Sequence, residues 1–315
     1  MNSVRVQAQR LTAEEYDGVS RSWDRYFVRA TAQARDQMIR MARLKTGERV
    51  LDIGTGTGAS AILAAHKVGK TGRVLGIDLS KRMLRRAKKN AANMKLANVA
   101  FRHMDSTSLK LPNESVDAII TSFGAPEGPY DARIMLKEWS RVLSRHGRLC
   151  FCEGGDGKAW KVIDRVVDKY KVAHPDRKLA ERRRLKRLIA RENKRTPLLC
   201  LSNLPKLRRQ MHNAGFRNVR KTTKAIGWTF PSTKALLTLV LSTGFSHEYA
   251  AMTVGAQRDF KERFSRSLKP FETPRGLCLG NRVFFLQADK NGAHASTRYP
   301  GWKLSKIAHG GLLDG

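Results

Sequence analysis

A glycine-rich turn and three aspartates are the residues of this chain whose types and spacing favour chemistry on a bound ligand. The apolar segment 49–53 leads into the sequence DIGTGTG at residues 52–58, and an apolar helical segment follows at 59–68. Glycines let the backbone turn sharply and let a ligand approach without a Cβ in the way. The helix that follows directs free N–H groups at the same point. We therefore expect a ligand to lie against this turn.

The three aspartates are spaced so that each would end a strand. Asp52 lies before the first glycine, where its carboxylate can face a cationic amino-acid group. Asp78 ends the next apolar segment, about 20 residues beyond the turn, and can accept hydrogen bonds from ribose hydroxyls. Asp105 follows a third segment and can accept from an adenine amino group. Because the carboxyl ends of parallel strands meet at one edge of a sheet, the three carboxylates are expected to converge on one crevice.

Strand and helix patterns alternate through the first half of the chain. Such alternation is typical of crossover units and a parallel sheet. Two later strands are expected at 216–223 and 281–288, and an apolar period of about 3.6 residues predicts a helix over 12–44. The expected strands of the first half are 49–53, 73–78, 98–103, 116–122 and 148–153, and the helices between them are 59–68, 80–94 and a segment around 134–143.

Segment 46–153 resembles the class I S-adenosylmethionine (SAM)-dependent methyltransferases, and within them the group that includes the ubiquinone/menaquinone-biosynthesis C-methyltransferases. The matching pieces are VLDIGTGTG, VLGIDLS, HMDSTSLKLPNESVDAIITSFG and LKEWSRVLSRHGRLCFCEGG. The resemblance implies a Rossmann-like α/β three-layer sandwich with a mostly parallel seven-stranded sheet, N-terminal helices and a helical lid inserted at 232–268. It also implies SAM as the cofactor. The competing interpretation, a nicotinamide-dependent dehydrogenase, shares the turn and Asp78 but needs neither Asp52 nor Asp105.

The same resemblance implies a role for each residue of the cofactor site. Asp52 and the glycines would line the methionine portion of SAM, Asp78 would hold the ribose, and Asp105 would hold the adenine amino group. Other residues would flank the adenine or face the sulfonium and the acceptor. The full expected set is Asp52, Gly54, Thr55, Gly56, Gly58, Asp78, Leu79, Met104, Asp105, Ser106, Ser122 and Phe123.

A general base is required only if the methyl acceptor must lose a proton. The lid segment 244–249 offers His247 and Tyr249 as candidate catalytic residues, acting as base or hydrogen-bond donor. The alternative is a helix start at Ser246 with Tyr249 packed in the core. The aromatic residues of segment 23–26 can close over SAM, with core packing as the other interpretation.

The charge of the chain is strongly unbalanced, with 61 Lys+Arg against 27 Asp+Glu and a formal net charge of +34. Such a field favours polyanions, although a basic proteome or a solubility strategy explains it equally well. The stretch 158–195 is the most basic part, and segment 177–195 (RKLAERRRLKRLIARENKR) predicts a basic amphipathic helix. It is either a solvated helix at the domain edge or an arm that contacts RNA or an anionic membrane surface.

The four cysteines form no Cys-x-x-Cys pair, and we expect reduced core cysteines and no metal site. Neither a secretory signal nor a run of about 18 apolar residues is found, so the expected location is cytoplasmic. The expected organisation is 1–45 N-terminal helical segment, 46–155 SAM-binding core, 156–204 basic helical insertion, 205–290 C-terminal part of the core with its lid, and 291–315 disordered tail.

The sequence therefore predicts an enzyme that methylates a carbon or oxygen of a small-molecule acceptor, quinone-like or lipid-like in character. An RNA methyltransferase that binds its substrate through the basic surface is the alternative. A third reading is a SAM-binding regulatory or assembly protein without turnover.

Overall fold

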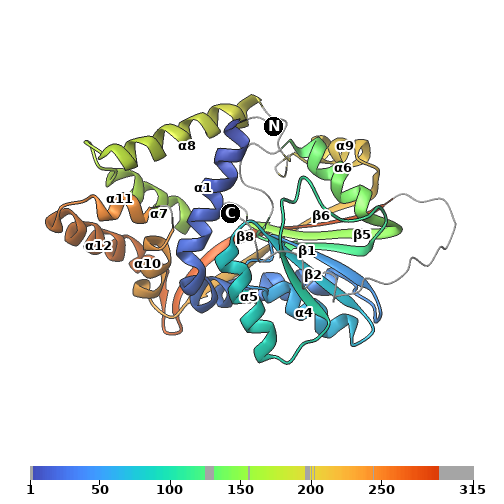
Figure 1. The fold of residues 1–315 in the computed structure, drawn as a ribbon. Helices are drawn as coiled ribbons and strands as arrows, with labels where there is room; N and C mark the ends of the chain where they lie inside the picture. The colour runs from blue at the N-terminus through green and yellow to red at the C-terminus, as the bar shows by residue number, and fades with distance from the viewer. Residues whose placement is uncertain are drawn as a thin grey trace.

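A mixed β-sheet forms the centre of the fold (Figure 1). The computed structural model describes residues 3–124, 131–154, 157–195, 199, 201, 203–243 and 245–290. The sheet has the order β3-β2-β1-β4-β5-β8-β6, in which the first five strands are parallel and β8 is antiparallel to both its neighbours. A two-residue strand β7 also pairs with β8. The strands are β1 Arg49–Ile53, β2 Arg73–Asp78, β3 Val99–His103, β4 Val116–Ser122, β5 Leu143–Gly154, β6 Phe216–Phe230, β7 Glu272–Thr273 and β8 Gly276–Lys290.

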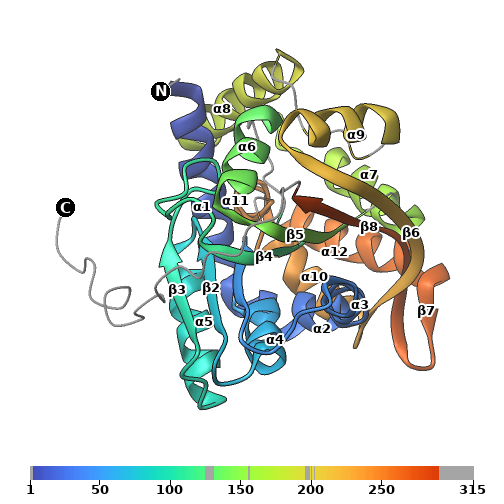
Figure 2. The same ribbon diagram turned by 90° about the vertical axis from the view of Figure 1, so that its right-hand side faces the viewer.

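Helices cover both faces of the sheet (Figures 1 and 2). One face packs against α3 (Ala32–Ala42), α4 (Ala59–Val68) and α5 (Lys81–Asn93). The other packs against α6 (Ala132–Val142) and α9 (Leu204–Asn213), whose Leu136, Trp139 and Met211 are fully buried. The parallel strands are apolar on both faces, as expected for strands covered on both sides. The predicted Rossmann-like three-layer architecture is confirmed.

The N-terminal helix begins earlier than predicted and is interrupted. Helix α1 (Ser3–Ser22) runs into a π-helical turn, Trp23–Phe27, which is followed by the short α2 (Val28–Ala30) and a break before α3. The predicted helical character of 12–44 is therefore confirmed almost to its end, at Ala42, but the segment is divided into several helical pieces. Single π-helical turns often occur at functional sites because they reorient side chains within a helix.

The helical lid lies where it was expected. It consists of α10 (Thr233–Leu241), α11 (Ser246–Ala250) and α12 (Val254–Leu268). The predicted strands 216–223 and 281–288 are too short, because β6 and β8 remain paired with each other beyond the residues of β8 that pair with β5. At the end of β6, Ile226, Trp228 and Phe230 alternate with exposed residues, and this apolar face is buried in the same core cluster as the lid helices.

The basic stretch forms two helices, α7 (Lys158–Lys169) and α8 (Arg177–Arg195), and the predicted basic amphipathic helix corresponds to α8. Part of its charge is neutralised within the fold. Arg182 and Lys186 lie 3.0 and 2.8 Å from Glu15 of α1, and Arg183 lies 2.6 Å from Glu248 of α11. Helix α8 thus joins the N-terminal helix to the lid.

Three sequence expectations concern residues outside the described ranges. The disordered tail 291–315, the residue Gly244 of the lid segment and Cys200 belong to this group.

The ion pair between Arg183 and Glu248 yields a prediction about stability. Both Glu248 oxygens accept from Arg183, and one also accepts from the N–H of Val172, while the Glu248 side chain is 11% exposed. We expect Glu248→Gln to lower the free energy of unfolding by about 1–2 kcal/mol, because the partly screened Arg183 charge loses its partner. Urea unfolding measures the change.

The matched control is Glu181→Gln. The pair between Arg177 and Glu181 is solvent-exposed and 3.5 Å long, so its loss should cost less than about 0.5 kcal/mol. Equal effects of the two substitutions would show that α8 is not anchored through Glu248.

Candidate active site

The glycine-rich turn between β1 and α4 forms the centre of a crevice. Gly54, Gly56 and Gly58 have φ angles of 64°, 54° and 87°, values that favour glycine. A Cβ on Gly54 would lie 2.7 Å from the Cα of Gly124, so only glycine allows the turn to pack against the segment after β4. A ligand in this crevice can therefore come close to the backbone.

Asp78 joins the turn to the next strand. It ends β2, and its carboxylate accepts hydrogen bonds of 2.8 Å from the N–H groups of Gly56 and Ser80. Burial raises the pKa of Asp78, while these N–H groups favour the ionised form. The carboxylate lines the crevice next to the turn, where a ligand hydroxyl could reach it.

Asp52 lies beneath the turn and does not itself line the crevice. Its side chain accepts a 2.7 Å hydrogen bond from the hydroxyl of Thr55, and Oδ1 has no partner among the described residues. Burial raises the pKa of Asp52 to about 7, and the nearby charge of Arg35 opposes this shift. Asp52 is thus a buried acid whose ionised form would be favoured by a positive charge placed close to it.

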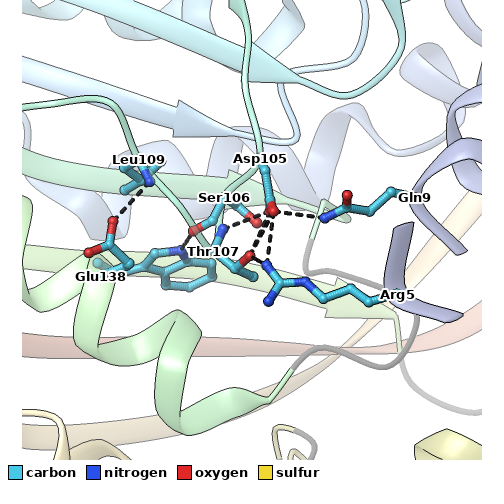
Figure 3. Close-up of polar contacts among 8 residues, drawn as sticks. Arg5, Gln9, Asp105, Ser106, Thr107, Leu109 and Glu138 are labelled. Atoms are coloured by element: carbon cyan, nitrogen blue, oxygen red, sulfur yellow. Dashed lines mark hydrogen bonds and ion pairs between the residues drawn. The ribbon is translucent and has the colours of Figure 1, made fainter. Parts of the chain in front are cut away.

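Asp105 is held by the N-terminal helix (Figure 3). Its Oδ2 accepts hydrogen bonds from Arg5 at 2.9 Å and Gln9 at 2.7 Å. The N–H and hydroxyl of Thr107 donate to Oδ1 at 2.8 Å, and Arg5 also contacts the Thr107 hydroxyl. Because these contacts use most of the acceptor capacity of a carboxylate, Asp105 fastens α1 over the crevice instead of facing into it.

Most of the predicted cofactor residues lie together at the crevice, but three of them do not line it. Asp52, Gly58 and Asp105 do not line the crevice. Trp139 donates a 3.0 Å hydrogen bond to the carbonyl of Ser106 and so fixes the loop after β3. The predicted residues that do line the crevice are Gly54, Thr55, Gly56, Asp78, Leu79, Met104, Ser106, Ser122 and Phe123.

Sequence reasoning missed much of the wall that the N-terminal helices contribute. Tyr16, Phe27, Thr31 and Arg35 line the crevice beside Trp23, which the aromatic segment 23–26 had suggested. The aromatic residues among them follow an ordinary helical period, so the sequence offered no signal that separates a ligand-facing aromatic side chain from a core one.

The two candidate catalytic residues lie away from the crevice. His247 lines a separate hollow between α1, α8 and α11, where burial and the charges of Arg182 and Lys178 lower its pKa. Tyr249 packs edge-on against Phe260 with ring centroids 5.8 Å apart. Neither side chain can therefore contact a ligand at the glycine-rich turn. The structure favours the alternative interpretation of Tyr249, in which its ring is packed in the core.

Two further observations concern metals and membranes. Cys150 and Cys152 are buried, and burial raises the pKa of each thiol to about 12. Within the described ranges, no group of three or more His, Cys, Asp or Glu side chains is arranged to hold a metal ion. Among the same residues, no helix is long and apolar enough to cross a bilayer.

Comparison with known proteins agrees with this geometry. Residues 44–193 match the family described as a methyltransferase domain. Over 143 residues, 45% of this chain and 64% of the relative, the chain is 33% identical to aklanonic acid methyltransferase DauC of Streptomyces sp. strain C5. Over 138 residues, 43% of this chain and 58% of the relative, it is 29% identical to demethylmenaquinone methyltransferase of Listeria monocytogenes. The chain thus spans about three fifths of the length of these relatives.

A solved structure shares the fold. The YcgJ protein of Bacillus subtilis superposes with a TM-score of 0.52 at 16% identity, covering 83% of this chain and 100% of that one. The sheet order, the glycine-rich turn and these likenesses define a class I SAM-dependent methyltransferase domain. Residues 44–193 thus form a methyltransferase domain of the class I SAM-dependent kind, and part of the chain is similar in sequence to demethylmenaquinone methyltransferases.

The cofactor of this class is SAM, and the crevice fits it. Asp78, Met104 and Ser106 line the crevice, and the family resemblance would assign them to the ribose and the adenine of SAM. The hydroxyl of Thr57 is buried at the crevice with no partner among the described residues, so it is available to a ligand.

The raised pKa of Asp52 predicts a pH dependence of cofactor binding. SAM carries positive charge, which favours the ionised form of a carboxylate below it. Because the pKa of Asp52 is about 7, affinity should rise as the pH increases through 7, by up to about tenfold from pH 6 to 8. Titration calorimetry of SAM binding tests this, and Asp52→Asn should bind more weakly with a flat profile. An unchanged profile in Asp52→Asn would assign the titration to another group.

The contact between Arg5 and Asp105 predicts that α1 helps retain the cofactor. Arg5→Ala should weaken SAM binding by about tenfold, as expected for loss of a charge-assisted hydrogen bond. Asp105→Ala should have a similar effect, and the double variant should be little worse than either. If Asp105→Ala weakens binding while Arg5→Ala does not, the carboxylate contacts adenine directly and the role of α1 is disproved. Arg10→Ala, an exposed change on the same helix, is the control.

Proposed function

We propose that the chain transfers the methyl group of SAM to a carbon or oxygen of an apolar small molecule, quinone-like or lipid-like in character. The observation that carries this proposal is the aromatic wall of the crevice. Tyr16, Trp23, Phe27 and Phe123 line it, and Trp228 packs behind them.

The rings of this wall support one another. Trp23 and Phe27 stack with centroids 3.9 Å apart, and Phe27 meets Phe123 edge-on at 5.7 Å. Trp228 meets both Phe27 and Phe123 edge-on, at 5.4 and 5.2 Å. Such packed rings offer a rigid apolar surface on which a flat or hydrocarbon ligand can lie. They also exclude water, which favours an in-line displacement at the sulfonium methyl.

Arg35 adds a positive charge to the same crevice. It lines the crevice and donates a 2.9 Å hydrogen bond to the carbonyl of Val28. Burial lowers its pKa, but a guanidinium remains charged in proteins. Its field would favour an ionised oxygen on the acceptor, and this would make that oxygen or the adjacent carbon more nucleophilic. SAM supplies the electrophilic methyl group, and the chain orients the acceptor toward it.

The names of the relatives support the same class of acceptor. Two of them are named for aklanonic acid and for demethylmenaquinone.

The structure offers less support for the alternative function, that of an RNA methyltransferase. The cations of α8 that face the fold are paired with acids of α1 and α11, and the rings that line the crevice are packed against one another.

The aromatic wall can be tested with labelled SAM. The purified chain, methyl-labelled SAM and either demethylmenaquinone or a hydroxyanthraquinone should give label in the organic phase. Phe27→Ala should raise the acceptor KM by about tenfold or more, because a buried aromatic contact is lost. The SAM affinity should fall by less than the acceptor affinity, because the glycine-rich turn and Asp78 are unchanged.

The matched control is Trp160→Ala. Trp160 contacts Trp228 at 5.7 Å but does not line the crevice, so its loss should alter the acceptor KM by less than about threefold. Label recovered in nuclease-sensitive RNA from a host extract, with none in the organic phase, would refute the small-molecule proposal.

A further inference from the structure

A groove lined by arginines lies outside the active site, between the N-terminal helix and α5. Helices α1 and α5 pack side by side (Figure 1). Two hollows along their junction share Arg21 and Arg86 and so form one continuous groove. We call it the arginine groove. One wall carries Arg21, Arg25 and Arg29, and the other carries Arg82, Arg85, Arg86 and Lys89.

The two acidic residues that line the arginine groove, Asp17 and Asp24, already accept hydrogen bonds within the protein. Asp24 accepts from Arg86 at 2.7 Å and from Asn90 at 3.0 Å. Asp17 accepts from the hydroxyl of Ser80 and from the N–H of Arg82. The other six cations have exposed side chains and form no ion pair within the part of the chain that the structure describes. The arginine groove therefore carries a concentrated positive charge that the fold itself leaves uncompensated.

The spacing of these cations is regular. On the first wall they recur every four residues from Arg21 to Arg29, a length of roughly 12 Å at the rise of a helix. Like charges at this spacing repel one another along a helix. Rows of positive charge on both walls are complementary to a polyanion whose negative charges repeat along its length. A single phosphate would engage only two or three of the side chains.

The lining also favours one kind of polyanion. It includes no aliphatic side chain, and it is concave, so it suits insertion into a membrane poorly. Arginine forms bidentate hydrogen bonds with phosphate more readily than lysine does. Tyr26 lies in the groove with the Arg25 guanidinium 5.6 Å from its ring centroid, and an aromatic ring of this kind can stack on a nucleic-acid base.

We propose that the arginine groove binds the phosphate backbone of a single-stranded RNA. The site is separate from the crevice. Trp23 and Phe27 of the π-helical turn face the crevice, whereas Arg21, Arg25 and Arg29 line the arginine groove. The bound RNA is therefore a docking partner of the enzyme and not its methyl acceptor, and this inference is independent of the acceptor proposed above.

The test measures binding of a fluorescein-labelled, mixed-sequence RNA of roughly 12 nucleotides to the full chain by fluorescence anisotropy. The groove variant is Arg21→Gln/Arg25→Gln/Arg29→Gln. The matched control is Arg184→Gln/Arg187→Gln/Arg191→Gln, which removes the same charge from the exposed face of α8. Titration calorimetry with SAM shows whether each variant keeps the wild-type crevice, since neither triple touches it.

The groove variant should bind RNA at least about tenfold more weakly, and the slope of log K against log salt should fall by about 2. The α8 variant should stay within about threefold of the wild type. Equal losses in both variants would show that only diffuse charge attracts RNA, and unchanged binding in the groove variant would exclude the site. The proposal is also overturned if vesicles containing phosphatidylserine bind in a groove-dependent manner while RNA does not.

Discussion

The active site depends on the carboxylate of Asp78. It ends β2, yet its two oxygens accept from the N–H groups of Gly56, in the turn after β1, and Ser80, at the start of α5. Two neighbouring strands and a helix are thereby fixed relative to one another at the edge of the sheet where the crevice lies. The same contacts hold a partly buried acid in the crevice, where its position beside the turn suits it to ribose hydroxyls.

Helix α1, helix α8 and the lid helices, which together we call the cover, come from distant parts of the chain and are joined to one another by side-chain contacts. Helix α1 is attached to the core through Asp105 and through the start of α5, and to α8 through Glu15. Helix α8 is attached in turn to the lid through Glu248. Many of these links are ion pairs of moderate exposure, which salt screens more readily than it weakens apolar packing. The cover and the core can therefore respond differently to ionic conditions.

The strong positive charge of the chain has more than one structural use. On α8, the cations that face the fold neutralise acids of α1 and α11. On the outer side of the π-helical turn, arginines instead gather along a groove with few acids. A net charge alone does not distinguish these two arrangements, because it carries no information on which side chains meet.

The sequence by itself determined the sheet, the glycine-rich turn and the positions of Asp78, Ser122 and Phe123, because local patterns fix where a parallel strand ends. Tertiary structure alone decided that Asp105 holds Arg5 and Gln9, that His247 lies in another hollow, and that Trp23 and Phe27 line the crevice. These outcomes depend on how helices far apart in sequence pack together. An apolar period predicts that a helix face is covered, but the neighbouring elements determine what covers it.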